Sequence, residues 1–279
     1  MKSVGIIGYP LGHSISPQIH NFIYQKLSIE AFYKKWEFEE INMSSELNKI
    51  NDSNFIGANV TVPYKEKIIS FLDEIESEAK HIGAVNTIVK YQNQLIGHNT
   101  DVYGIEKCLH TIFQSENIKN VVILGSGGAA KAALYVLLNR GLKNLSLINR
   151  TPLNAKNMLA RFDTYNFDSK ILTFDQKTEI QNDCLNSDLI INSTTIGMKG
   201  TDLESKSPLE TICFNGNSVV FDMVYNPRIT KLIANSTTKN ATIIEGIDML
   251  VYQAIKSIEL WTGQIPSFDL MKKKCLELL

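Results

Sequence analysis

A glycine-rich run, Gly125-Ser126-Gly127-Gly128-Ala129-Ala130, is the clearest chemical feature of the sequence. It follows a continuous apolar stretch, Val121–Leu124, and precedes a helical pattern over 129–139 that Arg140-Gly141 ends. Glycines at this spacing permit a tight turn, and the amide groups that begin the helix can bind a pyrophosphate. A glycine turn that only packs the strand on the helix is the alternative, but the strand–loop–helix context favours dinucleotide binding.

The next predicted strand, 145–149, ends in Asn149-Arg150-Thr151. An NAD-binding protein usually carries an acidic residue here, which accepts hydrogen bonds from the ribose hydroxyls. The guanidinium of Arg150 would instead suit a 2′-phosphate, through charge-assisted hydrogen bonds. A solvated surface arginine is the simpler alternative. The glycine loop upstream leads us to predict NADP rather than NAD.

Two hydroxyls, those of Ser14 and Ser16, come just before a predicted helix over 16–27. Aided by the helix dipole, they could hold a substrate carboxylate. Ser16 is equally well explained as the N-cap of that helix, with Pro17 at its first position. Ser14 is not explained in this way, so it is the stronger candidate.

Asn59 and Thr61 share one face of a predicted strand over 55–62, because side chains alternate along a strand. Lys65 lies in the turn into a predicted helix over 64–72, where a positive charge opposes the helix dipole. That cost makes Lys65 a candidate acid–base residue, although such a lysine is usually solvated. Asn86 and Asp101 stand near the ends of predicted strands, where a turn or cap role would explain each one alone.

Short strand patterns alternate with helical patterns throughout, which predicts an α/β protein with mostly parallel strands. We expect an N-terminal α/β substrate-binding domain over 1–103, a Rossmann-type dinucleotide-binding domain over 104–245, and C-terminal helices over 246–279 that return to the first domain. The remaining predicted elements are strands over 4–8, 31–37, 189–193 and 219–223, a hairpin of 84–90 with 94–99 around Gln92-Asn93, and helices over 44–51 (capped by Ser44 or Ser45), 101–113, 154–162, 249–261 and 268–278.

Composition narrows the classes of function. The 279 residues carry 28 Lys+Arg and 29 Asp+Glu, and this balance argues against a nucleic-acid partner. No apolar run approaches the ~18 residues of a membrane span, and the first residues do not form a signal peptide. The balanced charge is also consistent with a small-molecule substrate. The four cysteines form no CxxC pair, so we predict no metal site and a cytoplasmic location.

Taken in order, these motifs resemble those of the shikimate dehydrogenase family. The similarity extends from the first predicted strand to the last predicted helix, and it therefore covers the chain. The matching residues are Gly8-Tyr9-Pro10, His13-Ser14-Ile15-Ser16-Pro17, His20-Asn21, Asn59-Val60-Thr61-Val62-Pro63 with Lys65, Gly83-Ala84-Val85-Asn86-Thr87, Asn99-Thr100-Asp101, the glycine run 125–130, Asn149-Arg150-Thr151, Asp222-Met223-Val224-Tyr225-Asn226-Pro227, Met249 to Gln253 and Trp261-Thr262-Gly263.

The resemblance implies reversible reduction of 3-dehydroshikimate to shikimate by NADPH, a step of aromatic amino-acid biosynthesis, in a monomer or homodimer. It implies that Lys65 and Asp101 form the catalytic pair. The substrate carboxylate would be bound by Ser14, Ser16 and Tyr225, and the ring by Asn59, Thr61, Lys65, Asn86, Asp101 and Gln253. The cofactor site would comprise Gly125, Ser126, Gly127, Gly128 and Ala129, then Asn149, Arg150 and Thr151 at the adenosine end, with Thr194, and with Met223 and Gly246 at the nicotinamide.

The chain departs from the family pattern at two positions. Asn154 stands where a second basic residue is frequent, with Lys156 two positions further on, which weakens the expected preference for NADP over NAD. Thr195 stands where proline is frequent, and we expect only a local effect. Two alternatives therefore stay open: a quinate/shikimate dehydrogenase of broader cofactor use, and a non-catalytic NADP-binding regulator, which would be expected to have lost Lys65 or Asp101.

Overall fold

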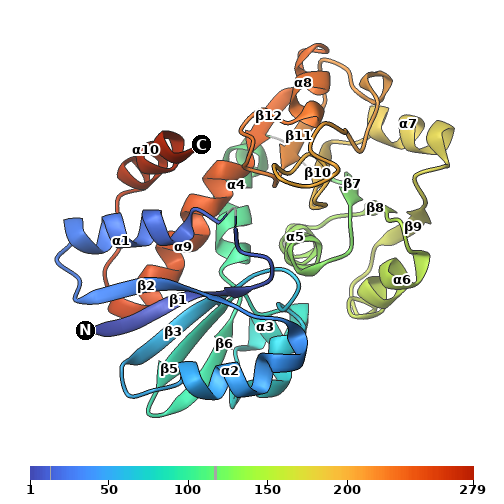
Figure 1. Cartoon of the computed structure of the whole chain (residues 1–279). Helices are drawn as coiled ribbons and strands as arrows, with labels where there is room; N and C mark the ends of the chain where they lie inside the picture. Colours follow the sequence, from blue (N-terminus) through green and yellow to red (C-terminus); the bar gives the residue numbers. More distant parts are fainter. Residues whose placement is uncertain (13, 116–117) are drawn as a thin grey trace. The chain divides into compact units, whose positions relative to one another are not determined.

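The computed structural model describes residues 1–12, 14–115 and 118–279, which form two compact units (Figure 1). The first unit comprises Met1–Tyr103 and Val251–Leu278. The second comprises Gly104–Leu250, with Leu279. Each unit is built on a six-stranded sheet of its own. None of the helices in these ranges is long and apolar enough to cross a membrane.

The strand directions in the sheet of the first unit decide which loops lie at the same edge. β1 is parallel to β2 and β3, whereas β5 is antiparallel to both β3 and β6. The carboxyl ends of β1, β3 and β6 and the amino end of β5 therefore lie at the same edge. The strand order is β2-β1-β3-β5-β6-β4, with β1 (Lys2–Gly8), β2 (Ala31–Glu37), β3 (Phe55–Val60), β4 (Glu74–Ile75), β5 (Thr87–Tyr91) and β6 (Gln94–His98).

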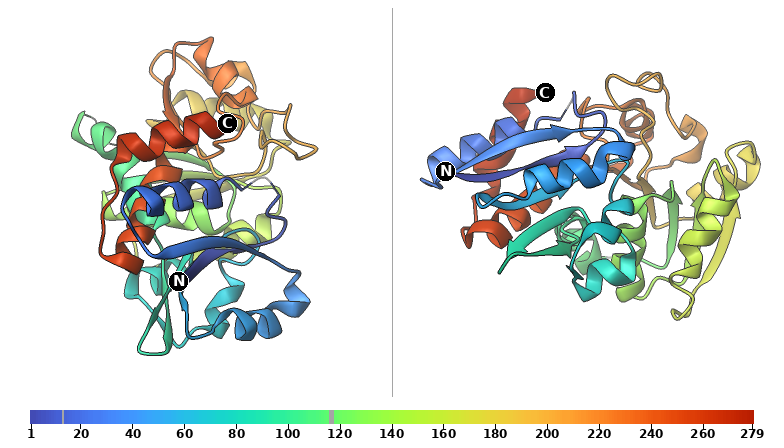
Figure 2. Two further views of the ribbon diagram at one scale, coloured as in Figure 1. Left: turned by 60° about the vertical axis from the view of Figure 1, so that its left-hand side comes forward. Right: turned by 60° about the horizontal axis from the view of Figure 1, so that its bottom comes forward.

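Helices cover both faces of this sheet (Figures 1 and 2). One side carries α1 (Ser16–Lys26) and α9 (Gly246–Thr262), and α10 (Phe268–Leu278) packs beside α1. The other side carries α2 (Met43–Ile50) and α3 (Ser77–Ile82). The 3₁₀ turns η1 (Glu40–Asn42) and η2 (Lys67–Phe71) belong to the same unit.

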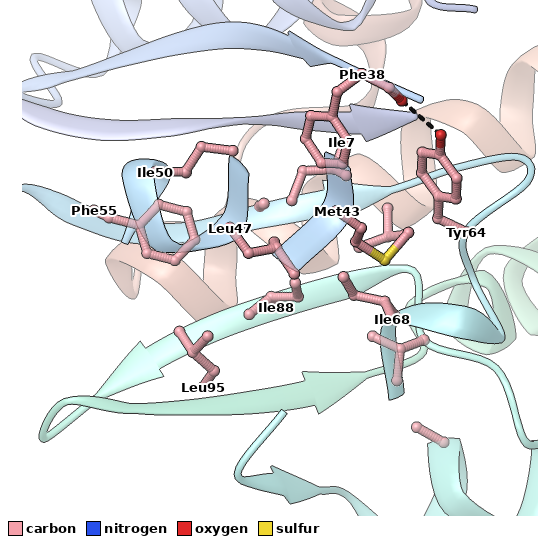
Figure 3. Close-up of a cluster of buried hydrophobic side chains, with 14 residues drawn as sticks. Ile7, Phe38, Met43, Leu47, Ile50, Phe55, Tyr64, Ile68, Ile88 and Leu95 are labelled. Carbon is pink, nitrogen blue, oxygen red and sulfur yellow. Dashed lines mark hydrogen bonds between the residues drawn. The ribbon is translucent and has the colours of Figure 1, made fainter. Parts of the chain in front are cut away.

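The core beneath α2 forms because its apolar residues recur at helical spacing. Met43, Leu47 and Ile50 lie on one face of α2 and pack in one cluster with the strand residues Phe55 and Ile88 (Figure 3). At the edge of the cluster, the buried Tyr64 hydroxyl donates to the carbonyl of Phe38 at 2.5 Å (Figure 3). This bond anchors the segment that precedes Lys65.

The opposite face brings α9 unusually close to β3. A Cβ on Gly57 would lie 2.2 Å from Trp261 Nε1 and 2.4 Å from the carbonyl oxygen of Ile88. Trp261 Nε1 itself donates to that carbonyl at 2.8 Å. Because Gly57 has no side chain, the C-terminal helix α9 can pack directly on β3, which lies about two hundred residues earlier in the sequence.

His20 of α1 is buried near Trp261, on the same face of the sheet, and is held neutral there. Its ring stacks on Tyr33 at 4.1 Å, and Nδ1 lies 3.4 Å from the Tyr24 hydroxyl. Burial without a charged partner lowers the pKa of His20 to about 3. Below pH 6.5 the unfolded chain thus binds a proton that the folded chain does not, so stability falls as the pH drops from 6.5 towards 3.

We expect His20→Phe, which keeps an aromatic ring against Tyr33, to flatten this pH dependence. Between pH 7 and pH 5 the wild-type protein should lose about 2 kcal/mol more unfolding free energy than His20→Phe. Urea unfolding at both pH values measures the difference. His110→Gln is the control, because His110 is exposed. Equal losses in wild-type protein and His20→Phe would show that His20 does not titrate in this way.

The second unit has the strand order of a Rossmann fold. Its sheet is wholly parallel, and the order reverses between β7 and β10, the position where such folds bind dinucleotides. The strands, in the order β12-β11-β10-β7-β8-β9, are β7 (Asn120–Leu124), β8 (Asn144–Ile148), β9 (Asp168–Leu172), β10 (Leu189–Asn192), β11 (Val219–Asp222) and β12 (Thr242–Glu245). The helices are α4 (Asp101–Ser115, which starts in the first unit), α5 (Gly128–Asn139), α6 (Pro152–Ala160), α7 (Lys177–Leu185), the 3₁₀ turn η3 (Thr211–Cys213) and α8 (Lys231–Thr237).

The predicted α/β class, with a Rossmann-type unit, is confirmed, but three local predictions were wrong. Ser16 is not the N-cap of α1: it is already helical, and no side chain caps the helix. Neither Ser44 nor Ser45 caps α2, which starts one residue earlier, at Met43. The segment 64–72 forms only the 3₁₀ turn η2, because the carbonyl of Lys65 bonds outside the segment, to Val85 N at 2.7 Å.

Candidate active site

The predicted substrate residues of the first unit leave one edge of its sheet. Ser14 and Ser16 follow β1, and Thr61 and Lys65 follow β3. Asn86 immediately precedes β5, and Asp101 follows β6. Because these strand ends share an edge, residues far apart in the sequence are gathered there.

Lys65 and Asp101 form a shielded ion pair. Lys65 Nζ lies 2.5 Å from Asp101 Oδ2, and the two side chains are only 18% and 5% exposed. The second carboxylate oxygen of Asp101 accepts from Asn86 Nδ2 at 2.8 Å, and the Asp101 amide donates to Asn99 Oδ1. An ammonium carries three N–H donors, so Lys65 can donate to a further oxygen without leaving Asp101.

Asn59 and Asn86 belong to the same buried network. Asn59 Oδ1 accepts from the Tyr33 hydroxyl at 2.7 Å, and its Nδ2 donates to Thr87 Oγ1 and Ser257 Oγ. Both amide hydrogens of Asn59 thus have acceptors within the protein, and one lone pair on Oδ1 remains for another donor. The structure therefore joins Asn59, Asn86, Asp101 and Lys65 in one network.

The remaining substrate candidates of the first unit lie around this network. Ser14 is half-buried, and its Oγ accepts from the Ser16 amide at 3.4 Å. Thr61 packs so closely on the β1 terminus that a Cβ on Gly8 would lie 2.5 Å from Thr61 Cγ2. Gln253 is half-buried on α9 and is linked to the network because its carbonyl accepts from Ser257 Oγ at 3.0 Å. His13, in the Ser14 motif, lies outside the described residues.

The glycine loop of the second unit combines a positive φ with partly exposed residues at a helix start. Gly125 adopts a φ of +100°, and a Cβ there would lie 2.8 Å from Ser193 Oγ. At Gly127, the residue before α5, a Cβ would meet no described atom within 4 Å. Ser126, Gly128 and Ala129 are partly exposed at the start of the helix. Amides at the start of a helix have no carbonyl partner within the helix, so those at the start of α5 suit an anionic ligand.

Asn149, Arg150 and Thr151 follow β8, which neighbours β7 in the sheet, so they leave the same edge as the glycine loop. Arg150 is exposed, and Asn149 Nδ2 donates to the Thr151 carbonyl at 2.8 Å. Thr151 precedes α6, and its side chain does not cap the helix. Asn154 and Lys156, on the first turns of α6, are also exposed.

Thr194 and Met223 follow β10 and β11, and Gly246 follows β12, all at this same edge. The Thr194 hydroxyl is already used, since it donates to Asn192 Oδ1 and accepts from Ile196 N. Gly246 must lack a side chain, because a Cβ would lie 2.6 Å from the carbonyl oxygens of both Asp222 and Met223. These contacts fix the loops after β10 and β11.

Asp222 is a functional candidate of the second unit that sequence reasoning did not single out. Its buried carboxylate accepts from Asn192 Nδ2, Thr230 Oγ1 and Val224 N at 2.9, 2.5 and 3.1 Å. Burial raises the pKa of Asp222 to about 6, although the hydrogen bond from Thr230 opposes the rise. Asp222 holds the start of the loop that carries the half-buried Tyr225, a carboxylate candidate that belongs to the second unit, whereas the two serines belong to the first.

A chain that combines a Rossmann unit with an open glycine loop and a unit with a shielded lysine–aspartate pair is typical of nicotinamide-dependent dehydrogenases. Comparison with family models matches residues 6–88 to the shikimate dehydrogenase substrate binding domain and 107–244 to shikimate/quinate 5-dehydrogenase. Residues 246–276 match the shikimate 5′-dehydrogenase C-terminal domain. The chain belongs to the shikimate dehydrogenase family, and the resemblance predicted from its motifs is confirmed.

Individual relatives match over nearly the whole chain. Shikimate dehydrogenase (NADP(+)) of Bacillus cereus (strain B4264) is 38% identical over 277 residues, which is 99% of this chain and 98% of that protein. The shikimate 5-dehydrogenase of Thermus thermophilus, solved with NADP(H) and shikimate, is 29% identical with a TM-score of 0.84 and full coverage of both chains. The enzyme of Listeria monocytogenes, solved with shikimate and NAD, is 27% identical with a TM-score of 0.87, covering 98% of this chain and 96% of that one.

Proposed function

We propose that this protein is a shikimate dehydrogenase that interconverts shikimate and 3-dehydroshikimate with NADP. The observation that carries the proposal is the Lys65–Asp101 pair, at the sheet edge where the family's motifs converge. The pairing of both residues favours an enzyme over a non-catalytic regulator.

The chemistry follows from the charge that develops at the substrate oxygen. NADPH, when bound, supplies the hydride that reduces the ketone. As that oxygen becomes an alkoxide, Lys65 Nζ donates a proton to it, and in the reverse direction the same nitrogen accepts the hydroxyl proton. Asp101 keeps the ammonium oriented through its 2.5 Å contact. The shielding of both side chains strengthens these interactions by excluding water.

We assign the other substrate residues by the groups that they offer. Ser14 and Ser16, with Tyr225, would bind the carboxylate, and Thr61, Asn86 and Gln253 would bind ring hydroxyls. Asn59 would accept at most one further hydrogen bond, because the Tyr33 hydroxyl and two internal acceptors already occupy its amide. A polar site of this kind rejects an analogue that leaves its buried groups unpaired.

The cofactor assignment places the pyrophosphate at residues 125–129 and the adenosine end at Asn149, Arg150 and Thr151. The exposed Arg150 guanidinium would pair with the 2′-phosphate, with Lys156 as a secondary positive charge. Thr194, Met223 and Gly246 would lie at the nicotinamide end, Thr194 through its backbone because its hydroxyl is engaged. NAD use stays a candidate, since Asn154 supplies no second charge and the Listeria relative was solved with NAD.

The same function implies a division of the chain into domains, an oligomeric state and a location. Residues 1–103 would form the substrate-binding domain and 104–245 the NADP-binding domain, with 246–279 as the C-terminal helices of the first. We propose a monomer or homodimer that works on small molecules in the cytoplasm, where the cell's reduced NADP pool is available.

A panel of two substrates and two cofactors tests the proposal and its nearest alternative. Initial rates with shikimate or quinate, each with NADP or NAD, give four values of kcat/KM. We expect kcat/KM to be highest for shikimate with NADP. Replacing shikimate by quinate, or NADP by NAD, should lower it by about tenfold or more in each case. Comparable values for quinate would instead identify a quinate/shikimate dehydrogenase, and comparable values for NAD would remove the assigned role of Arg150.

A further inference from the structure

Three buried hydroxyls that none of the assignments above uses lie beside the Asn86 amide. They belong to Thr87 on β5, Thr100 just before α4, and Ser257 on α9, and we call them the hydroxyl cluster. Each residue is at most 2% exposed. The oxygens lie 2.9 Å apart for Thr87 and Ser257 and 3.1 Å apart for the other two pairs. The start of β5, the residue before α4 and the helix α9 thus meet at one buried group of hydroxyls.

The hydroxyl cluster, together with the backbone amide of Thr100, sets which way the Asn86 amide faces. Asn86 Oδ1 accepts from Thr100 N at 2.7 Å and from Thr87 Oγ1 at 3.0 Å. Asn86 Nδ2 can therefore turn to Asp101 Oδ1, to which it donates at 2.8 Å. If the amide were reversed, its oxygen would face the Asp101 carboxylate and its NH₂ group would face the Thr100 N–H. Both contacts would be repulsive in a buried site.

The surroundings limit the directions in which the hydroxyl cluster can donate. Ser257 Oγ donates to the Gln253 carbonyl at 3.0 Å, so towards the cluster it can only accept. Asn59 Nδ2 donates to both Ser257 Oγ and Thr87 Oγ1. Thr87 Oγ1 can donate to Asn86 Oδ1 at 3.0 Å. Thr100 Oγ1, which accepts from Asn86 Nδ2 at 3.0 Å, can donate to Ser257 Oγ at 3.1 Å, and this links Ser257 to the amide. Donation therefore runs from Tyr33 through Asn59, Thr87 and Asn86, and it ends on the Asp101 carboxylate.

We propose that Thr87, Thr100 and Ser257 are positioning residues for the Lys65–Asp101 pair: by fixing the Asn86 amide they keep a donor on the Asp101 carboxylate. The carboxylate then stays in place beside Lys65 Nζ. The inference rests on the proposed function, in which that pair transfers the proton. It assigns to the C-terminal helix α9 a part in catalysis through Ser257, which does not itself touch the pair.

The test compares variants that remove a hydroxyl with matched variants that keep it. Thr87→Val and Ser257→Ala remove one hydroxyl each, whereas Thr87→Ser keeps the hydroxyl and loses only a methyl group. Ser236→Ala is the control for a buried serine that bonds only to carbonyls of its own helix, α8. For each protein, kcat and KM for shikimate with NADP are measured across pH, together with urea unfolding.

We expect Thr87→Val and Ser257→Ala to lower kcat about tenfold while KM changes by no more than about twofold. Loss of the donor should also alter the kcat–pH profile. Thr87→Ser and Ser236→Ala should keep the wild-type kcat and profile. Ser257→Ala alone decides the matter if Thr87→Val does not fold.

The experiment distinguishes failure of the positioning role from failure of the proposed function. Folded hydroxyl-free variants with an unchanged kcat and pH profile, in an active wild-type background, would overturn this inference and leave the proposed function intact. Equal loss of activity in Thr87→Ser and Thr87→Val would also overturn it, since packing would then be the cause. A wild-type protein with no activity on shikimate would overturn the proposed function and this inference together.

Discussion

Replacing Lys65 with Ala is expected to lower kcat for shikimate oxidation by about 10²-fold or more while KM changes little. The reason is that Lys65 Nζ, held 2.5 Å from Asp101, is the group that takes and returns the proton of the reacting hydroxyl. Its contribution arises mainly in the transition state, where charge develops on that oxygen. Steady-state kinetics with saturating NADP measures the split between kcat and KM.

Lys67→Ala is the matched control for Lys65→Ala. Lys67 lies two residues further on, is exposed, and pairs with Glu40 on the surface, so its loss should leave kcat unchanged. Added small primary amines should restore part of the activity of Lys65→Ala, because a free ammonium can enter the space left by the side chain. A large rise in KM with kcat preserved would instead make Lys65 a substrate-binding residue.

Replacing Arg150 with Ala is expected to raise KM for NADP by about 10- to 100-fold while KM for NAD stays the same. Loss of a charge-assisted hydrogen bond to a phosphate costs about 1.5–3 kcal/mol, which corresponds to that range. NAD lacks the 2′-phosphate, so the same substitution removes no contact between the protein and NAD. Kinetics with both cofactors, and calorimetric titration of each, measure the two effects.

Arg140→Ala controls for the loss of an exposed arginine. Arg140 follows α5 at the end away from the glycine loop and lies 3.9 Å from Glu106, so neither cofactor should be affected. Lys156→Ala should have a smaller effect than Arg150→Ala. An equal loss of NADP and NAD binding in Arg150→Ala would place this side chain against a part that the two cofactors share.

The glycine loop and the hairpin show what sequence alone predicts well. Glycine at position 125 and the pair Gln92-Asn93 occupy backbone conformations with positive φ, which their residue types and neighbours signal locally. Strands such as β7 and β10 carry continuous apolar runs, which is typical of parallel strands covered on both faces. Local patterns therefore located the Rossmann unit, although the more polar β9 and the short β12 were missed.

The hydroxyl cluster shows what sequence did not predict. Thr87 and Ser257 are 170 residues apart, and their 2.9 Å contact depends on Gly57 letting α9 approach the sheet. Thr87 and Thr100 stood inside motifs that were noticed for their neighbours Asn86 and Asp101. Ser257 had one signal, as a polar residue inside an apolar helix and four positions after Gln253. Asp222 stood in a matching motif, but its role was not predicted, because its partners Asn192 and Thr230 come from other elements.

The most direct test of the account is the stoichiometry of the reaction in the wild-type protein. Shikimate and NADP are supplied together, and NADPH is followed by its absorbance while 3-dehydroshikimate is quantified by chromatography. We expect both products to appear in equal amounts, and 3-dehydroshikimate with NADPH to give the reverse reaction. A folded protein that binds NADP but forms neither product would contradict it.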